Sequence, residues 1–112
     1  MSDIQADVKI SEKTVIRTIV IQSPRLDPVM VCYSDTAPGQ GRIVVECYGS
    51  AWSAWWGSMG TDIEAFVASV NADYLTGALA PTCRTMTRKE SAYLKRIAEV
   101  VIRGMKLLIE GD

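Results

Sequence analysis

Three tryptophans lie within five residues of this chain, and they constrain its fold more than any other feature. Trp52, Trp55 and Trp56 are the only tryptophans in the 112-residue sequence. The surrounding run, residues 48–60, adds a tyrosine, a methionine and three glycines. Aromatic side chains carry large apolar areas and dominate both cores and interfaces. The segment is therefore either the centre of the core or the centre of a contact with a partner.

The local structure of this segment has two alternatives. In a helix, Trp52, Trp55 and Trp56 take positions i, i+3 and i+4 on one face. In a strand, Trp55 and Trp56 point to opposite faces, and one of them is exposed. The segment between Gly49 and Gly57 is too short to bury three large rings in so small a core. We therefore expect at least one ring buried against helices and at least one other partly exposed.

The periodicity of the chain changes from β-like to helical at the tryptophan segment. Three β-rich runs precede or enter it: residues 13–21, 29–33 and 43–48. Three segments of helical character follow it: residues 61–70, 71–79 and 87–109. This order predicts an α+β fold, a three-stranded antiparallel β-meander followed by three helices packed on one face of the sheet. The length fits a single domain over residues 1–112, with residues 1–11 expected to fray.

Two capping boxes mark expected helix starts. Thr61 and Thr87 each stand three residues before a glutamate, Glu64 and Glu90. In this motif the threonine side chain accepts a hydrogen bond from the first turn of the helix. The carboxylates Asp62 and Glu64 are explained by the same helix start, where the macrodipole favours anions. The last helix carries an apolar stripe: Leu94, Ile97, Val101, Met105 and Leu108.

The residue types that most enzymes need are scarce in this chain. It contains no histidine, which removes the commonest general base and the commonest metal ligand. The glycine-rich run at 57–60 lacks the lysine of a phosphate-binding loop. The spacing of Cys32, Cys47 and Cys83 is not that of metal ligands or of a redox motif. The sequence leaves undecided whether Cys32 and Cys47 are in diagonal contact across a hairpin. We expect a protein that is not an enzyme and has no catalytic residue, metal or cofactor.

Charge is close to balanced overall but uneven along the chain. The formal net charge is −1, yet residues 82–112 carry seven basic against four acidic side chains. Four basic residues of the last helix are candidates for partner contacts: Arg88, Lys95, Arg96 and Arg103. Glu99 interrupts this row of basic residues. The row therefore indicates a solvated helix face first, and a nucleic-acid-binding surface only weakly. The polar, acidic start and the lack of a membrane-length apolar run predict a cytoplasmic protein without membrane contact.

The tryptophan segment and the residues after it resemble a pattern in small bacteriophage and prophage proteins. The resemblance covers Glu46–Gly60, then Phe66 and Asn71–Leu75, and it is looser at Tyr93–Leu94 and Ile97. It implies a phage accessory protein in the host bacterial cytosol. Small proteins of that kind often bind and block a host protein, and anti-CRISPR proteins are the first such group to consider.

Together these features predict a phage accessory protein that binds and inhibits or modulates a host protein or protein complex. The expected contact residues are Trp52, Trp55, Trp56 and Tyr48, because tryptophan and tyrosine are over-represented among interface hot spots. The alternative is a nucleic-acid-binding accessory or regulatory protein that uses the basic last helix. The oligomeric state stays open, a homodimer included.

Overall fold

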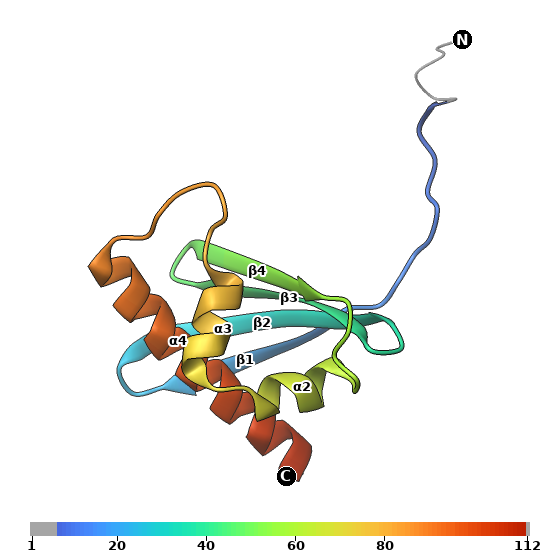
Figure 1. Ribbon diagram of the computed structural model, residues 1–112. Coiled ribbons are helices and arrows are strands. Elements are labelled where there is room, and N and C mark those ends of the chain that lie inside the picture. Colours follow the sequence, from blue (N-terminus) through green and yellow to red (C-terminus); the bar gives the residue numbers. More distant parts are fainter. Residues whose placement is uncertain (1–6, 112) are drawn as a thin grey trace.

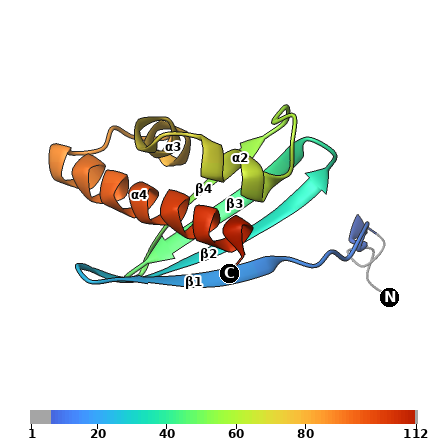
Figure 2. The ribbon, with the colours of Figure 1, turned by 90° about the horizontal axis from the view of Figure 1, so that it is seen from below.

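The computed structural model describes residues 7–111 and consists of a sheet and a layer of helices. The elements follow in this order: β1 (Arg17–Ser23), β2 (Leu26–Ala37), β3 (Gln40–Cys47), β4 (Ser50–Trp56), α2 (Ile63–Ser69), α3 (Ala72–Leu79) and α4 (Arg88–Glu110) (Figure 1). The strands form one antiparallel sheet in the order β1-β2-β3-β4. All three labelled helices lie on one face of it (Figure 2).

The α+β class and the helices on one face are confirmed, but the three-stranded meander is wrong. The tryptophan segment is itself the fourth strand, paired with β3 from Gly41–Trp56 to Cys47–Ser50. The strand alternative for this segment is therefore the correct one. A two-residue turn makes the pairing possible, because Tyr48 and Gly49 both adopt positive φ, 51° and 82°. Such turns match the twist of adjacent antiparallel strands.

The core lies between the helices and one face of the sheet, where strand side chains alternate between buried and exposed. The sheet contributes Val29, Val31, Tyr33, Ile43, Val45, Cys47 and Trp52. Helix α4 contributes Leu94, Ile97, Val101 and Met105, all fully buried. This confirms the predicted stripe except at its last member, since Leu108 is 42% exposed near the end of the helix. The fraying expected for residues 1–11 lies partly outside the described residues; residues 8–16 are exposed and belong to no helix or strand.

The two predicted helix starts have different outcomes. Thr87 is the N-cap of α4, and its Oγ1 accepts a hydrogen bond from Glu90 N at 3.1 Å. Thr61 is not a cap; Asp62 is the N-cap of α2, and its Oδ1 accepts from Ala65 N at 2.8 Å. The helix starts one residue later than predicted, an arrangement that places Ile63 in the core and gives the cap a charged acceptor that the macrodipole favours.

We expect Asp62→Ala and Thr87→Ala each to lower the free energy of unfolding by about 0.5–2 kcal/mol, because each leaves a first-turn N–H without its side-chain acceptor. Thr61→Ala is the matched control and should change stability by less than about 0.5 kcal/mol. Urea denaturation of the three variants measures this. A loss for Thr61→Ala equal to that for Asp62→Ala would contradict the cap assignment.

The diagonal contact left open between Cys32 and Cys47 does not form. Cys47 pairs with Val29 and is buried on the core face, whereas Cys32 pairs with Val44. Adjacent positions of a strand point to opposite faces, so a register that sets Cys47 opposite residue 29 rather than 30 separates the two thiols. Cys32 instead accepts a hydrogen bond from Thr18 Oγ1 at 3.6 Å.

Candidate functional site

The sheet separates the tryptophans as the strand alternative predicted. Trp52 is 7% exposed and meets Tyr93 of α4 edge-to-face, with ring centroids 6.2 Å apart. Trp56 is partly buried beside Phe66 of α2, at a centroid distance of 5.1 Å, and its Nε1 donates to the Tyr74 hydroxyl at 3.0 Å. These two rings join β4 to the helices. The expectation that at least one ring is buried is confirmed.

Trp55 lies on the other face of the sheet and is 53% exposed, so the expectation of an exposed ring is also confirmed. Its cross-strand neighbour is Arg42 of β3. The indole lies over the backbone of Gly57, where a Cβ atom would come within 2.7 Å of Trp55 Cη2. The missing side chain at Gly57 thus leaves space for the ring. A large aromatic surface is presented at a defined position beside the sheet edge.

A groove of about 570 Å³ runs along the outer edge of β4. It lies between this strand and the segment after α3, and its lining includes Trp52, Ala54, Trp55, Ala78, Pro81 and Cys83. Since β4 is the last strand of the sheet, the backbone groups on this edge have no strand partner among the described residues. The geometry combines an unpaired strand edge, an apolar groove and an exposed tryptophan.

The remaining predicted contact residues lie elsewhere. Tyr48 is 81% exposed in the turn before β4. Lys95 forms an ion pair with Asp73 at 3.1 Å, and Arg96 donates to the backbone oxygen of Arg25 at 3.2 Å. Arg88 and Arg103 are exposed, but they lie fifteen positions apart on α4.

The structure does not bring the basic residues of α4 onto the surface that presents Trp55. Helix α4 lies against the core face of the sheet (Figure 2), whereas Trp55 projects from the opposite face. The aromatic and the basic candidates are therefore two separate surfaces, and Lys95 and Arg96 already have partners within the chain.

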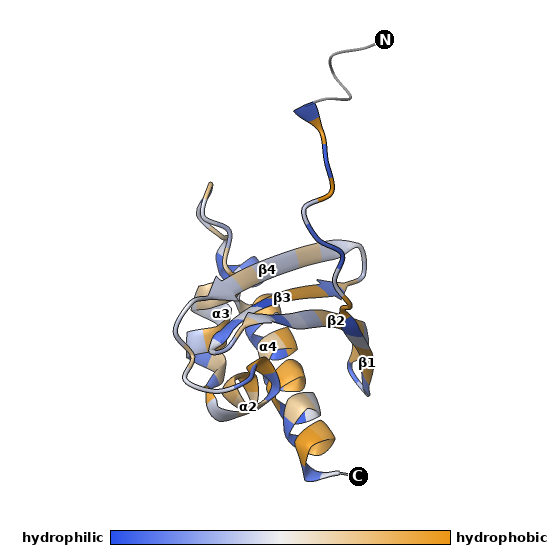
Figure 3. Cartoon of the chain, turned by 90° about the vertical axis from the view of Figure 1, so that its right-hand side faces the viewer, coloured by the Kyte–Doolittle hydropathy of each residue, from blue (hydrophilic) through white to orange (hydrophobic). Residues whose placement is uncertain are grey.

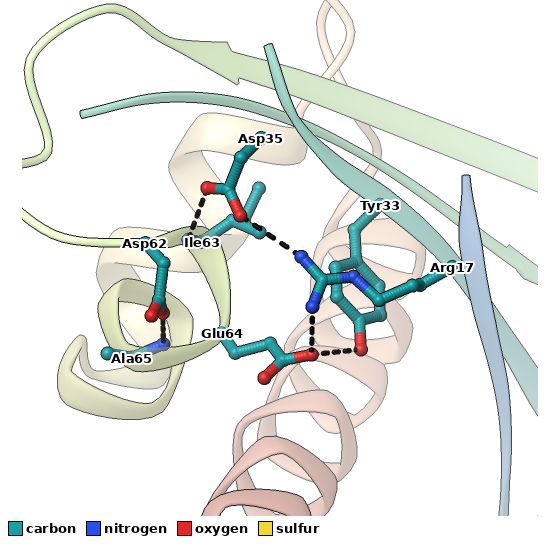
Figure 4. Close-up of polar contacts among 7 residues, drawn as sticks. All are labelled: Arg17, Tyr33, Asp35, Asp62, Ile63, Glu64 and Ala65. Atoms are coloured by element: carbon teal, nitrogen blue, oxygen red, sulfur yellow. Dashed lines mark hydrogen bonds and ion pairs between the residues drawn. The ribbon is translucent and has the colours of Figure 1, made fainter. Parts of the chain in front are cut away.

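A polar cluster that the sequence did not predict joins the start of α2 to β1 and β2 (Figure 4). Tyr33 donates its hydroxyl proton to Glu64 Oε2 at 2.6 Å. The Arg17 guanidinium pairs with Asp35 at 3.1 Å and with Glu64 at 3.2 Å. The other oxygen of Asp35 accepts from Ile63 N at 2.9 Å. Glu64 therefore binds Tyr33 and Arg17, and the prediction that it completes a capping box is wrong.

The contacts of this cluster hold the start of α2 against β1 and β2. Burial, followed by the hydrogen bond to Glu64, raises the pKa of Tyr33 to about 12. At neutral pH the hydroxyl is thus a proton donor held by a carboxylate, and it is not a nucleophile. A single sequence offers no signal for the cluster, because its residues come from three elements that meet only after folding.

Two further observations concern the residues that the structure describes. Over residues 7–111, no helix is both long enough and apolar enough to cross a bilayer. In the same part of the chain, no group of three or more histidine, cysteine or acidic side chains is placed to hold a metal ion.

Among protein families, the model of a phage family, Phage_phiTE_072, matches the chain over residues 8–107. The chain belongs to this family. The match spans all four strands and most of α4 of this phage protein, so the sheet, the groove and Trp55 are all within the family domain. No curated protein and no solved structure matches the chain.

Proposed function

We propose that this phage protein is a non-enzymatic accessory protein that binds a host protein or protein complex in the bacterial cytosol and inhibits or modulates it. The observation that carries the proposal is the exposed Trp55 beside the groove on the free edge of β4. Blocking a host defence complex, as anti-CRISPR proteins do, is the specific form of this activity to test first.

The energetics of interfaces support this surface. A few buried aromatic residues supply most of the binding energy in protein complexes, and tryptophan is prominent among them. An indole that already has a defined position loses less conformational entropy on binding. An unpaired strand edge can also add an extended segment of a partner through main-chain hydrogen bonds, with neighbouring grooves taking alternate side chains. The β4 edge offers both kinds of contact.

We expect Trp55→Ala to weaken binding to the host partner by about 2 kcal/mol, roughly a thirtyfold rise in Kd, because it removes the aromatic anchor. Partners captured from host lysate by the wild-type chain are compared with those captured by Trp55→Ala, and the affinity of each retained partner is then measured. The supporting result is a partner whose retention depends on Trp55, while the thermal midpoint of the variant stays close to that of wild type.

A glycine pair provides the matched control. Gly57→Ala should weaken the same binding by displacing the Trp55 ring, whereas Gly77→Ala, with no atom within 4 Å of the added Cβ, should leave it unchanged. Equal retention by wild type and a folded Trp55→Ala variant contradicts the proposal. Salt-dependent binding to random DNA that is lost on substitution of Arg88 and Arg103 would support nucleic-acid binding through α4 instead.

A further inference from the structure

The other edge of the sheet is formed by β1, which has no strand partner on its outer side among the described residues. Natural sheets protect such edges with charges, prolines or bulges. Residues 18–21 of β1, Thr-Ile-Val-Ile, contain no charge, proline or glycine, and the irregularity in the β1–β2 register follows them, between Ile21 and Ser23. The one charged residue of the strand, Arg17, is engaged with Asp35 and Glu64. This edge is therefore open to another strand.

Exposed apolar side chains lie on this edge, beside it and in the segment that leads into it. Of the twelve large hydrophobic residues exposed among the described residues, eight lie before β1, on β1 or at the end of α4: Val8, Ile10, Val15, Ile16, Val20, Leu107, Leu108 and Ile109. Hydrophobic residues recur along the last turns of α4 (Figure 3). Patches of this kind on soluble proteins mark interaction surfaces.

A groove between β1 and α4 gives this surface its shape. Two adjoining hollows, of about 650 Å³ and 140 Å³, share Ile21, Gln22, Gly104 and Leu107 in their lining. Helix and strand come close at Gly104, where an added Cβ atom would collide with the Ile21 side chain. Residues 7–16, which lead into β1, extend away from the body of the same chain (Figure 1).

We propose that β1 pairs antiparallel with β1 of a second copy of this chain, giving a two-fold dimer with one sheet continuous across both copies. Over the regular part of the strand the edge is self-complementary: centred on Val20, the pairing sets Ile19 opposite Ile21, with no like charges facing each other. The same pairing directs the exposed segment before β1 of each copy along the other copy.

The exposed apolar area of these eight side chains is large compared with what such a dimer buries. The eight side chains are between 42% and 88% exposed. Together they carry on the order of 500 Å² of apolar surface, the larger part of the roughly 800 Å² that each partner contributes to a standard interface. The proposal does not rest on binding of a host protein at β4.

Sedimentation equilibrium of the full chain over a concentration series tests the pairing. We expect a monomer–dimer equilibrium, and we expect Leu107→Lys to raise the dissociation constant at least about tenfold by placing charge in the interface. The Leu107 side chain is 68% exposed in the single chain, and a lysine near a helix C-terminus is favourable, so the variant should fold. Val20→Lys is the second variant, because it sets two lysines opposite each other at the centre of the pairing.

Trp55→Ala is the control on the opposite edge of the sheet and should leave the dissociation constant unchanged. A wild-type chain that stays monomeric at every concentration of the series overturns the proposal. So does a dimer that Trp55→Ala dissociates and Leu107→Lys and Val20→Lys do not. None of these readouts involves a host protein, so failure here is distinct from failure of the proposed function.

Discussion

Replacing Trp52 with alanine is expected to lower the free energy of unfolding by about 3–5 kcal/mol, the range for truncation of a large buried aromatic residue. The side chain is 7% exposed, stands on the core face opposite Val45 and packs against Tyr93 of α4. The cavity would lie where β4 meets the last helix. Since many domains are stable by only about 5–15 kcal/mol, urea denaturation should show a large shift or an unfolded chain.

The same substitution at the other two tryptophans provides the comparison. Trp55→Ala should cost less than about 1 kcal/mol, because that ring is already half exposed on the uncovered face. Trp56→Ala should lie between the two, since it loses the Phe66 packing and the hydrogen bond to Tyr74. Equal and large decreases in the free energy of unfolding at all three positions would show that all three tryptophans belong to the core. Trp55 would then not be a binding anchor.

Replacing Gly41 with valine should cost about 3 kcal/mol, although valine favours strands and Gly41 stands within β3. An added Cβ atom would lie 2.9 Å from Ile63 Cδ1, 2.9 Å from Met59 Cε and 3.1 Å from Ile63 Cβ. The last of these atoms is fixed to the α2 backbone and cannot rotate away. The substitution therefore pushes the start of α2 off the sheet. Thermal and urea denaturation measure the loss.

Gly77→Ala is the control for Gly41→Val. Gly77 is exposed in the middle of α3, and nothing lies within 4 Å of the added Cβ. Alanine should therefore stabilise the chain by about 0.4–1 kcal/mol, through the lower conformational entropy of the unfolded state. A Gly41→Val variant as stable as wild type would show that α2 does not pack this closely on β3.

Features that depend on nearby residues could be predicted from the sequence. The Thr87 cap spans three positions, and the buried stripe from Leu94 to Met105 repeats every three or four. Both follow from helix geometry alone. The change from β-like to helical periodicity likewise predicted the α+β class. The tryptophan cluster indicated one buried and one exposed ring.

Features that join distant residues were decided by the tertiary structure. Whether residues 50–56 form a helix or a strand depended on pairing with β3, and that register selects Trp52 for the core and Trp55 for the surface. Tyr33 and Glu64 stand 31 positions apart. Their hydrogen bond, like the close packing at Gly41, exists only because α2 docks on the sheet. Local periodicity specifies which face of an element is apolar, but the partner of that face is set by packing between elements, and this packing decided where the candidate site lies.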